Sequence, residues 1–342
     1  MNKTPLTYLP SAAILAVILI APFAGVYPLF VLKVLCFALF ASAFNLLIGY
    51  AGLLSFGHAA LFGGAGYIAG HALKHWGITP ELALLVGTLA GALLGAGMGA
   101  LAIRRQGIYF SMITLALAQM LYFVCLQAPF TGGEDGLQGV PRGNLFGVLP
   151  LDDDRVLYYV VVAIVAAAFG LLGRIVASPF GSVLAAIKEH EQRAISLGYD
   201  ADRFKLIAFV LSAAISGLAG SLKVLVLGFE TLTDVHWSMS GTVILMALLG
   251  GIGTRWGPAL GALVIVTLET RIGDIGASLA SLTGIPAFQS LGESVTIVSG
   301  LLFVGTVMFL RGGLICALAP LARTTRVMQL RRVAARDKMQ GT

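Results

Sequence analysis

Charge is scarce in this sequence. Only 11% of the 342 residues are charged, whereas 58% are hydrophobic, and the mean hydropathy is +0.93. A soluble domain carries about 25% charged residues, which cover its water-facing surface. The chain therefore lacks the polar surface of a soluble enzyme, and its composition is typical of a protein that lies in a bilayer. At about 20 residues per helical span, it can cross roughly ten times.

Cysteine is also scarce. The three cysteines, Cys36, Cys125 and Cys316, each lie in an apolar stretch and have neither metal-ligand spacing nor a paired extracellular framework. We interpret them as packing residues. The net charge of +6 does not point to nucleic acid, because the basic residues lie between apolar runs or in the tail. We expect no nucleic-acid partner.

Catalytic motifs are missing as well. No lysine follows a glycine, so the phosphate-binding loop G-x-x-x-x-G-K-[ST] is absent, and there is no H-E-x-x-H motif. Ser55 does not lie in a G-x-S-x-G turn. We therefore expect no enzyme activity, no catalytic residues, no metal site and no cofactor.

Apolar runs fill most of the chain. Ten can be marked, at about 8–27, 28–49, 56–73, 81–103, 108–128, 156–173, 205–228, 241–254, 257–272 and 290–311. The first has no obvious small-residue cleavage site and continues into the next, which favours a membrane helix over a signal peptide. The runs predict an all-α polytopic membrane protein of about ten transmembrane helices, forming one transmembrane domain over residues 1–342.

The basic residues predict an orientation. They concentrate in four places: at Arg104 and Arg105, in the segment 174–204, at Arg255 and in the basic tail 312–342. An even number of apolar runs separates each place from the next, so all four fall on the same side of the membrane. Loops rich in Lys and Arg lie in the cytoplasm. We therefore expect a multi-pass protein whose two termini are both cytoplasmic.

Two glycine-rich stretches, 49–66 and 249–262, interrupt the helical pattern. Non-helical backbone at membrane depth is tolerated where protein or a water-filled cavity covers it, and paired interruptions indicate a transport path. Small residues also let helices pack closely, so both interpretations stay open. The candidate path residues are Ser55, Gly57, His58, Gly253 and Thr254. For His58, the alternative is a buried histidine whose hydrogen bonds are satisfied. For Ser55 and Thr254, it is a hydroxyl bonded to its own helix.

The segment 174–204 is too long for a simple helix connection. Ser178 followed by Pro179 predicts a helix start, Gly198 a helix end, and Asp200 the cap of the next span. Residues 184, 187, 191 and 194 or 195 recur at helical spacing, which predicts a short helix across them. A solvated connector is the alternative, but we favour a cytoplasmic docking element.

Few ionisable residues fall in the apolar runs. Five of those in or near the runs lie toward the outer ends of their segments: Lys33, Lys223, Glu269, Arg271 and Glu293. We expect them to pair or to extend to the interface. Glu230 and Asp234 are expected in the loops opposite the basic ones. No carboxylate is expected deep in the bundle.

The sequence resembles the LivM family, permease subunits of bacterial branched-chain amino-acid ABC importers. The resemblance covers about residues 30–311. Its motifs are Asn45-Leu-Leu-Ile-Gly-Tyr-Ala-Gly-Leu-Leu-Ser-Phe-Gly-His-Ala-Ala, Thr131-Gly-Gly-Glu-Asp-Gly-Leu, Ser178-Pro-Phe-Gly, Glu189-His-Glu-Gln-Arg-Ala-Ile-Ser-Leu-Gly and the stretch 250–262. It implies an ABC importer permease fold in the inner membrane, and import of branched-chain or other hydrophobic amino acids.

The resemblance also implies partners. The stretch 189–198 corresponds to the coupling helix that docks on an ATPase, which makes Glu189, His190, Glu191, Arg193, Ala194, Leu197 and Gly198 candidate docking residues. The implied partners are a second, LivH-like permease, LivG-like and LivF-like ATPases that hydrolyse the ATP, a periplasmic amino-acid-binding protein and membrane lipid. The alternative function is an ion-gradient-driven secondary transporter of a small polar solute, which would need a mid-membrane Asp or Glu.

Overall fold

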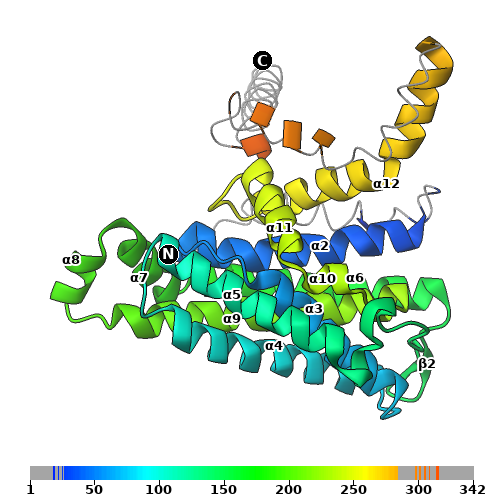
Figure 1. The fold of residues 1–342 in the computed structure, drawn as a ribbon, viewed down its shortest axis with the longest axis horizontal. Coiled ribbons are helices and arrows are strands. Elements are labelled where there is room, and N and C mark those ends of the chain that lie inside the picture. Colours follow the sequence, from blue (N-terminus) through cyan, green and yellow to red (C-terminus); the bar gives the residue numbers. More distant parts are fainter. Residues whose placement is uncertain are drawn as a thin grey trace, which may run out of the picture. The chain divides into compact units, whose positions relative to one another are not determined.

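The computed structural model describes residues 27–283, with only the backbone for 273–283, and scattered positions in 18–25 and 297–315. The predicted runs 8–27 and 290–311 lie almost entirely outside the described residues, and the tail from 316 onward, including Cys316, lies wholly outside them, as does Glu293. The chain divides into two compact units, Met1–Ile244 and Leu245–Thr342, which we describe separately (Figure 1). The single transmembrane domain stays a prediction.

Helices make up most of the described residues of the first unit. They are α2 (Pro28–Asn45), the π-helix η3 (Leu46–Ala51), α3 (His58–Lys74), α4 (Pro80–Ala102), α5 (Ile108–Gln127), α6 (Asp154–Ala177), α7 (Pro179–Glu189), α8 (Glu191–Ser196), α9 (Ala201–Leu227) and α10 (Leu232–Val235). Two 3-10 turns, η4 (Pro129–Thr131) and η5 (Gly133–Asp135), and an antiparallel hairpin of β1 (Asn144–Leu145) and β2 (Leu149–Pro150) lie between α5 and α6. Helix α11 (Trp237–Gly250) crosses the division, and α12 (Gly257–Thr283) lies in the second unit.

Five helical segments among the described residues are long and apolar enough to span a membrane. They are Pro28–Ala51, Pro80–Ala102, Ile108–Gln127, Asp154–Ala177 and Ala201–Leu227. Each matches a predicted apolar run, so the all-α polytopic architecture is confirmed. Helices α3 and α11 also match runs but have 17 and 14 residues. The total of ten spans stays a prediction.

Helix ends follow local chemistry. Asp153 and Asp200 accept hydrogen bonds from the first-turn amides of α6 and α9, which satisfies donors that have no partner within the helix. Prolines occupy the first turns of α2, α4 and α7. Gly228, with φ +76°, ends α9, because glycine adopts the left-handed conformation without steric cost.

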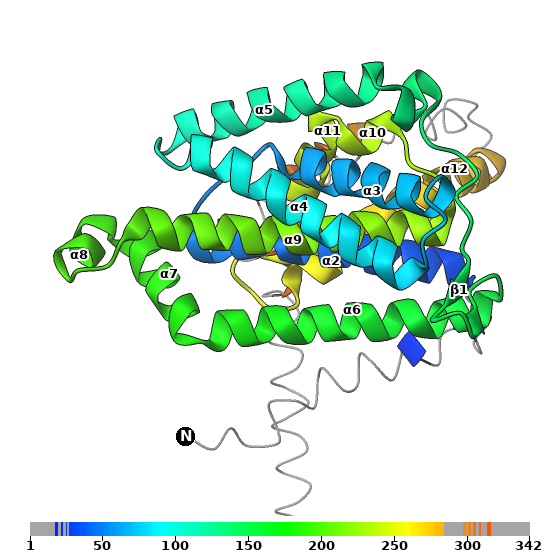
Figure 2. The same cartoon turned by 90° about the horizontal axis from the view of Figure 1, so that it is seen from below.

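Helix α9 is central in the first unit and packs against α2, α3 and α4, while α5 and α6 form the two flanks (Figure 2). Glycines of α4 recur every fourth residue along this contact. A Cβ on Gly91 would lie 2.8 Å from the Ala213 carbonyl oxygen and 2.9 Å from Gly217 Cα. This spacing lets the two helix backbones approach closely.

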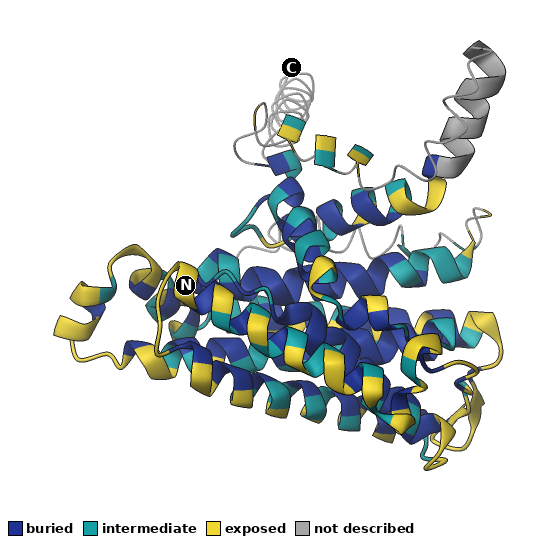
Figure 3. Cartoon of the chain, viewed as in Figure 1, coloured by how far each residue is buried: buried dark blue, intermediate teal, exposed yellow. Residues whose placement is uncertain are grey.

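Exposed residues follow the outer faces of the helices (Figure 3), and many of them are large and apolar. On α4 and α5 the exposed ones are Leu82, Leu85, Leu89, Leu93, Leu101, Ile108, Tyr109, Met112, Met120, Phe123 and Val124. An outer surface this apolar is typical of helices that face lipid. Within the core, Cys36 and Cys125 are buried and free, which confirms the packing role expected for these two cysteines.

In the second unit, the end of α11 and the start of α12 approach through glycine. A Cβ on Gly261 would lie 2.9 Å from Gly250 N and would overlap the Met246 carbonyl. The two helices are joined by residues 251–256. This is the interruption predicted in 249–262.

Candidate functional site

The first interruption lies between η3 and α3. Residues 52–57, called the break from here on, form no helix, and Gly52 begins it with φ +72°. The preceding turn is a π-helix, a rare form that is frequent at functional sites. The interruption predicted within 49–66 is therefore confirmed.

Side chains from other helices satisfy the backbone of the break. Ser111 and Thr114 of α5 bind Leu54 O and Phe56 N, at 2.6 and 3.2 Å. From α11, Ser240 Oγ donates to Phe56 O at 2.7 Å and accepts from Ala59 N at 3.0 Å. Backbone that leaves a helix at membrane depth must find such partners. Residues 53–57 of the break are thus buried or half-buried against protein, whereas Gly52 is exposed.

Ser55 and Gly57, two of the predicted path residues, lie inside the break. Ser55 is fully buried, and its Oγ accepts from Gly57 N at 3.2 Å. A Cβ on Gly57 would lie 3.0 Å from the Thr114 carbonyl oxygen. Ser55 therefore bonds locally, close to the alternative stated from the sequence, but within the break and not within a helix.

His58, the third predicted path residue in this region, begins α3 and has no exposed surface. Its Nε2 lies 2.8 Å from Ser212 Oγ, and Ser212 Oγ donates to Ala43 O at 2.6 Å. Because the one hydroxyl hydrogen points to Ala43, the imidazole donates through Nε2. The rings of Phe44 and Phe209 meet the imidazole edge-on, with centroids at 5.2 and 5.5 Å. The histidine is thus buried and satisfied at Nε2, but its Nδ1 has no hydrogen-bond partner among the described residues, so the alternative of a buried, satisfied histidine holds only for Nε2.

The other predicted path residues, Gly253 and Thr254, lie in the second unit. Thr254 Oγ1 donates to Gly251 O at 2.7 Å and accepts from Gly257 N at 3.1 Å. This local bonding is also the alternative that the sequence analysis stated for Thr254. The structure therefore places Ser55, Gly57 and His58 together, and a transport role for all five residues stays a prediction.

Glycines of α3 beyond the break serve close packing. A Cβ on Gly63 would lie 2.8 Å from the Asp234 backbone, and one on Gly66 would lie 2.9 Å from the Glu230 carboxyl carbon. The glycine face of α3 thus receives the segment 228–235. Of the two interpretations of stretch 49–66, packing holds for these glycines.

The second part of the site is the elbow, residues 179–198, which comprises α7 and α8. Gly198 ends it with φ +90°, and Asp200 caps α9, as predicted. Pro179 begins α7 and Ser178 stands at its N-cap, as predicted, but the Ser178 side chain makes no capping bond, because its Oγ donates back to Ile175 O at 2.6 Å.

The helix predicted across residues 184–195 is divided at His190, whose φ of −149° and ψ of 86° are not helical. Ile187, Ala194 and Ala201 form a small buried cluster. This cluster joins α7, α8 and the start of α9. Helical spacing alone could not show this, because the burial is set by contacts between elements.

The seven predicted docking residues divide into two groups. Glu191 and Ala194 point inward: Ala194 is buried, and Glu191 Oε1 accepts from Lys205 Nζ at 2.5 Å and from Gln106 Nε2 at 3.1 Å. The other five, Glu189, His190, Arg193, Leu197 and Gly198, are exposed. Leu197 is 71% exposed. Residues 189–193 and Gln106 line a surface hollow.

The Gln106–Glu191 bond also bears on orientation. It joins the loop after Arg104 and Arg105 to the elbow, so two of the predicted basic segments lie at the same end of the first unit. This agrees with a common side for both. Cytoplasmic termini stay a prediction.

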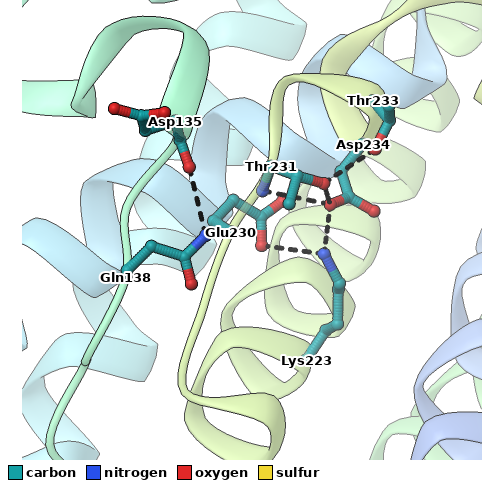
Figure 4. Close-up of polar contacts among 7 residues, drawn as sticks. All are labelled: Asp135, Gln138, Lys223, Glu230, Thr231, Thr233 and Asp234. Carbon is teal, nitrogen blue, oxygen red and sulfur yellow. Dashed lines mark hydrogen bonds and ion pairs between the residues drawn. The ribbon is translucent and has the colours of Figure 1, made fainter.

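At the other end of α9 lies a charge cluster that the sequence analysis missed, formed by Lys223, Glu230 and Asp234 (Figure 4). All three are buried, with exposed fractions of 3, 0 and 5%. Lys223 Nζ binds Asp234 Oδ2 and lies 3.2 Å from Glu230 Oε2. Asp234 Oδ2 also accepts from Thr231 N and Oγ1. The pairing predicted for Lys223 is confirmed.

The predicted loop position holds for Glu230, which lies between α9 and α10, whereas Asp234 lies in the short helix α10. The burial of both carboxyls was not predicted. Residue 230 pairs with Leu137 through two backbone hydrogen bonds of 2.8 and 2.9 Å, and α10 then folds Asp234 onto α3. Both acids follow the C-terminal end of α9, at the end of the bundle. Only the short spacing from Lys223 to the two acids could have indicated the cluster.

The cluster carries two carboxyls and one ammonium. Glu230 Oε1 has no hydrogen-bond partner among the described residues. Burial raises the pKa of the Glu230 carboxyl well above its ordinary value; Lys223 opposes this shift and Asp234 adds to it. We expect Glu230 to hold a proton over a wider pH range than an exposed glutamate.

Comparison with known proteins agrees with this fold. A family model described as "Branched-chain amino acid transport system / permease component" matches residues 27–310. The LivM permease proteins of Salmonella typhimurium and Escherichia coli are 28% and 27% identical, over 67% of this chain and 60% of their own length. The autoinducer 2 permease protein LsrC of Klebsiella pneumoniae is 27% identical over 53% of this chain and 52% of its own.

The chain spans about 60% of the length of the two LivM relatives. No solved structure matches it. The family match covers the helices from α2 onward, including the break, the elbow and the charge cluster. This chain belongs to the family of branched-chain amino acid transport permease components.

Proposed function

We propose that the chain is a permease subunit of an ATP-binding-cassette importer in the bacterial inner membrane. Its substrates are branched-chain or other hydrophobic amino acids, moved into the cytoplasm. The family match over residues 27–310 carries this proposal. The transport systems printed in the relatives' names support the substrate class.

The proposed partners are a second, LivH-like permease, LivG-like and LivF-like ATPases and a periplasmic amino-acid-binding protein. The chain itself hydrolyses no ATP and needs no cofactor. The elbow docks on an ATPase through its exposed residues, above all Leu197, while Glu191 and Ala194 hold its shape. Arg104, Arg105 and the elbow face the cytoplasm.

The proposed transport step is an exchange of partners at the break. In this structure Ser111, Thr114 and Ser240 bind its backbone. A zwitterionic amino acid needs hydrogen-bonding groups that replace water without holding it too tightly. Rigid-body movement of the helices around the break frees these groups, together with Ser55 and His58, for the solute. Gly253 and Thr254 are the matching groups of the second unit.

Co-purification with the ATPase subunits tests the docking role. Leu197→Asp places a charge on an exposed side chain, so we expect normal membrane insertion but at least about tenfold weaker ATPase binding. Val148→Asp, at a residue that is 80% exposed in the β1–β2 hairpin, is the matched control. Unchanged ATPase recovery with Leu197→Asp would contradict the docking role.

Transport in vesicles tests the mechanism. We expect leucine uptake only when the complete transporter, the binding protein and ATP are present. The alternative function, an ion-gradient-driven secondary transporter, predicts uptake by this chain alone when a proton or sodium gradient is applied. That result would overturn the proposed function, and Glu230 would then be the first carboxylate to replace.

A further inference from the structure

Helix α7 of the elbow is bonded directly to the chain that enters the break. Lys188 Nζ donates to Gly49 O of the π-helix η3 at 2.7 Å. The stem of the same side chain passes over Gly52, where a Cβ would lie 3.0 Å from Lys188 Cγ. A larger residue at position 52 would push the stem away, and φ +72° at Gly52 also favours glycine. The contact therefore needs both residues.

A second contact lies one helical turn earlier. Leu184 is fully buried and belongs to the core cluster that contains Leu47, Ala51 and Leu53. Residues four apart share a helix face, so Leu184 and Lys188 hold the same face of α7 against η3 and the start of the break. The leucine supplies apolar packing, and the lysine supplies the polar bond.

Lys188 also stands next to the bend of the elbow. Its neighbour Ile187 packs with Ala194 and Ala201, and the helix ends at His190. A displacement of α8 therefore reaches α7 through Ile187. Lys188, the next residue of α7, is bonded to the Gly49 carbonyl, so the displacement reaches that carbonyl as well.

We propose that Lys188 is the positioning residue that transmits movement of the elbow to the break. When α7 moves, the Lys188 ammonium moves the Gly49 carbonyl and, with it, the left-handed turn at Gly52. The backbone of residues 54–57 then exchanges its hydrogen-bond partners. A lysine suits this role because its ammonium is a compact charge with rotatable donors on a flexible stem, so its bond to the Gly49 carbonyl can persist while α7 moves. This inference rests on the proposed function for its transport consequence, but the link itself is a property of this chain.

Hydrogen exchange of the full chain in lipid nanodiscs tests the link without partners. Lys188→Met keeps the length and the apolar stem but removes the bond. We expect amide exchange of residues 53–57 to rise about tenfold, because the charge-assisted bond is lost. Lys74→Met is the matched control, since Lys74 Nζ binds the Gln138 carbonyl at the same 2.7 Å but at the other end of the unit. Unchanged exchange of residues 53–57 in Lys188→Met, or an equal rise in Lys74→Met, would overturn the link.

The complete transporter tests the consequence, measured as leucine uptake per ATP hydrolysed. For Lys188→Met we expect ATPase subunits that bind and hydrolyse ATP normally but uptake per ATP that falls about tenfold. Lys74→Met should retain the wild-type ratio, and Lys188→Arg should restore part of it. Wild-type uptake per ATP in Lys188→Met would overturn the inference while the proposed function stands. Failure of the wild-type chain to bind ATPases would refute the proposed function, and hydrogen exchange would still decide the link.

Discussion

The two ends of α9 use the same kind of residue in different ways. One buried lysine stands near each end, Lys205 at the elbow and Lys223 at the charge cluster, about 27 Å apart at the helical rise. Lys205 pairs with one carboxylate, Glu191, whose side chain is 22% exposed. Lys223 faces two, Glu230 and Asp234, with side chains only 0 and 7% exposed. The first pair keeps partial contact with water through Glu191, whereas the second is closed off from water, so we expect the elbow end to move more easily and the cluster end to act as an anchor.

The largest effect is expected from Lys223→Met. The substitution leaves two buried carboxyls without their ammonium, and losing one partner of a buried ion pair costs about 3–5 kcal/mol in the free energy of unfolding. Thermal unfolding in detergent would measure the loss. Stability equal to the wild type would show that the cluster does not anchor this end of α9.

The next effect is a pH dependence at the same end. The pKa of the Glu230 carboxyl is raised above its ordinary value of 4.5, so above pH 4.5 the unfolded chain has lost a proton that the folded chain still holds. The free energy of unfolding therefore falls as pH rises, by at most about 1.4 kcal/mol per pH unit, until the folded pKa is passed.

Glu230→Gln should flatten this slope between pH 5 and pH 8, measured by thermal unfolding at each pH. Glu134→Gln, at an exposed glutamate of η5, is the control and should keep the wild-type slope. An unchanged slope in Glu230→Gln would mean that water reaches the cluster, and the contrast between the two ends of α9 would disappear.

A smaller effect is expected from Lys205→Met. Glu191 keeps the Gln106 donor and partial contact with water, so the cost should be about 1–2 kcal/mol. The same unfolding measurement serves, together with hydrogen exchange of α8, which should rise. A loss as large as that of Lys223→Met would show that the two ends are equally closed.

The smallest effect is expected from Asp200→Ala, which removes the N-cap of α9 while leaving the Lys205–Glu191 pair. N-cap substitutions of this kind cost about 1 kcal/mol. Exchange of the amides in the first turn of α9, that of Arg203 above all, should rise without change at residues 223–227. Faster exchange at both ends would contradict independent behaviour of the two ends.

Much of the elbow could be predicted from the sequence. The cap by Asp200 and the turn at Gly198 depend on residues within a few positions of each other, and local geometry decides them. Ser178 shows the limit of such arguments, because it stands at the N-cap of α7 as predicted but makes no capping bond with its side chain. A serine before a helix can bond forward or backward, and here its Oγ binds Ile175 O.

The break could be located from the sequence but not explained by it. Glycine and the interruption of the apolar pattern identify the stretch 49–66, in which the break lies. The residues that satisfy its backbone, such as Ser111 and Ser240, are 57 and 184 positions away. Nothing in their local sequence distinguishes them from other serines of apolar helices.

The amino-acid sequence by itself determined that this chain is a helical membrane protein, where most of its helices begin and end, and where the helices are interrupted. Those properties depend on composition and on neighbours within one or two turns. Only the tertiary structure decided that Glu230 and Asp234 are buried with Lys223, that Glu191 faces inward, and that Lys188 binds Gly49. Burial of a charge depends on which distant backbone or ion comes within bonding distance, and only the packing of whole helices sets that distance.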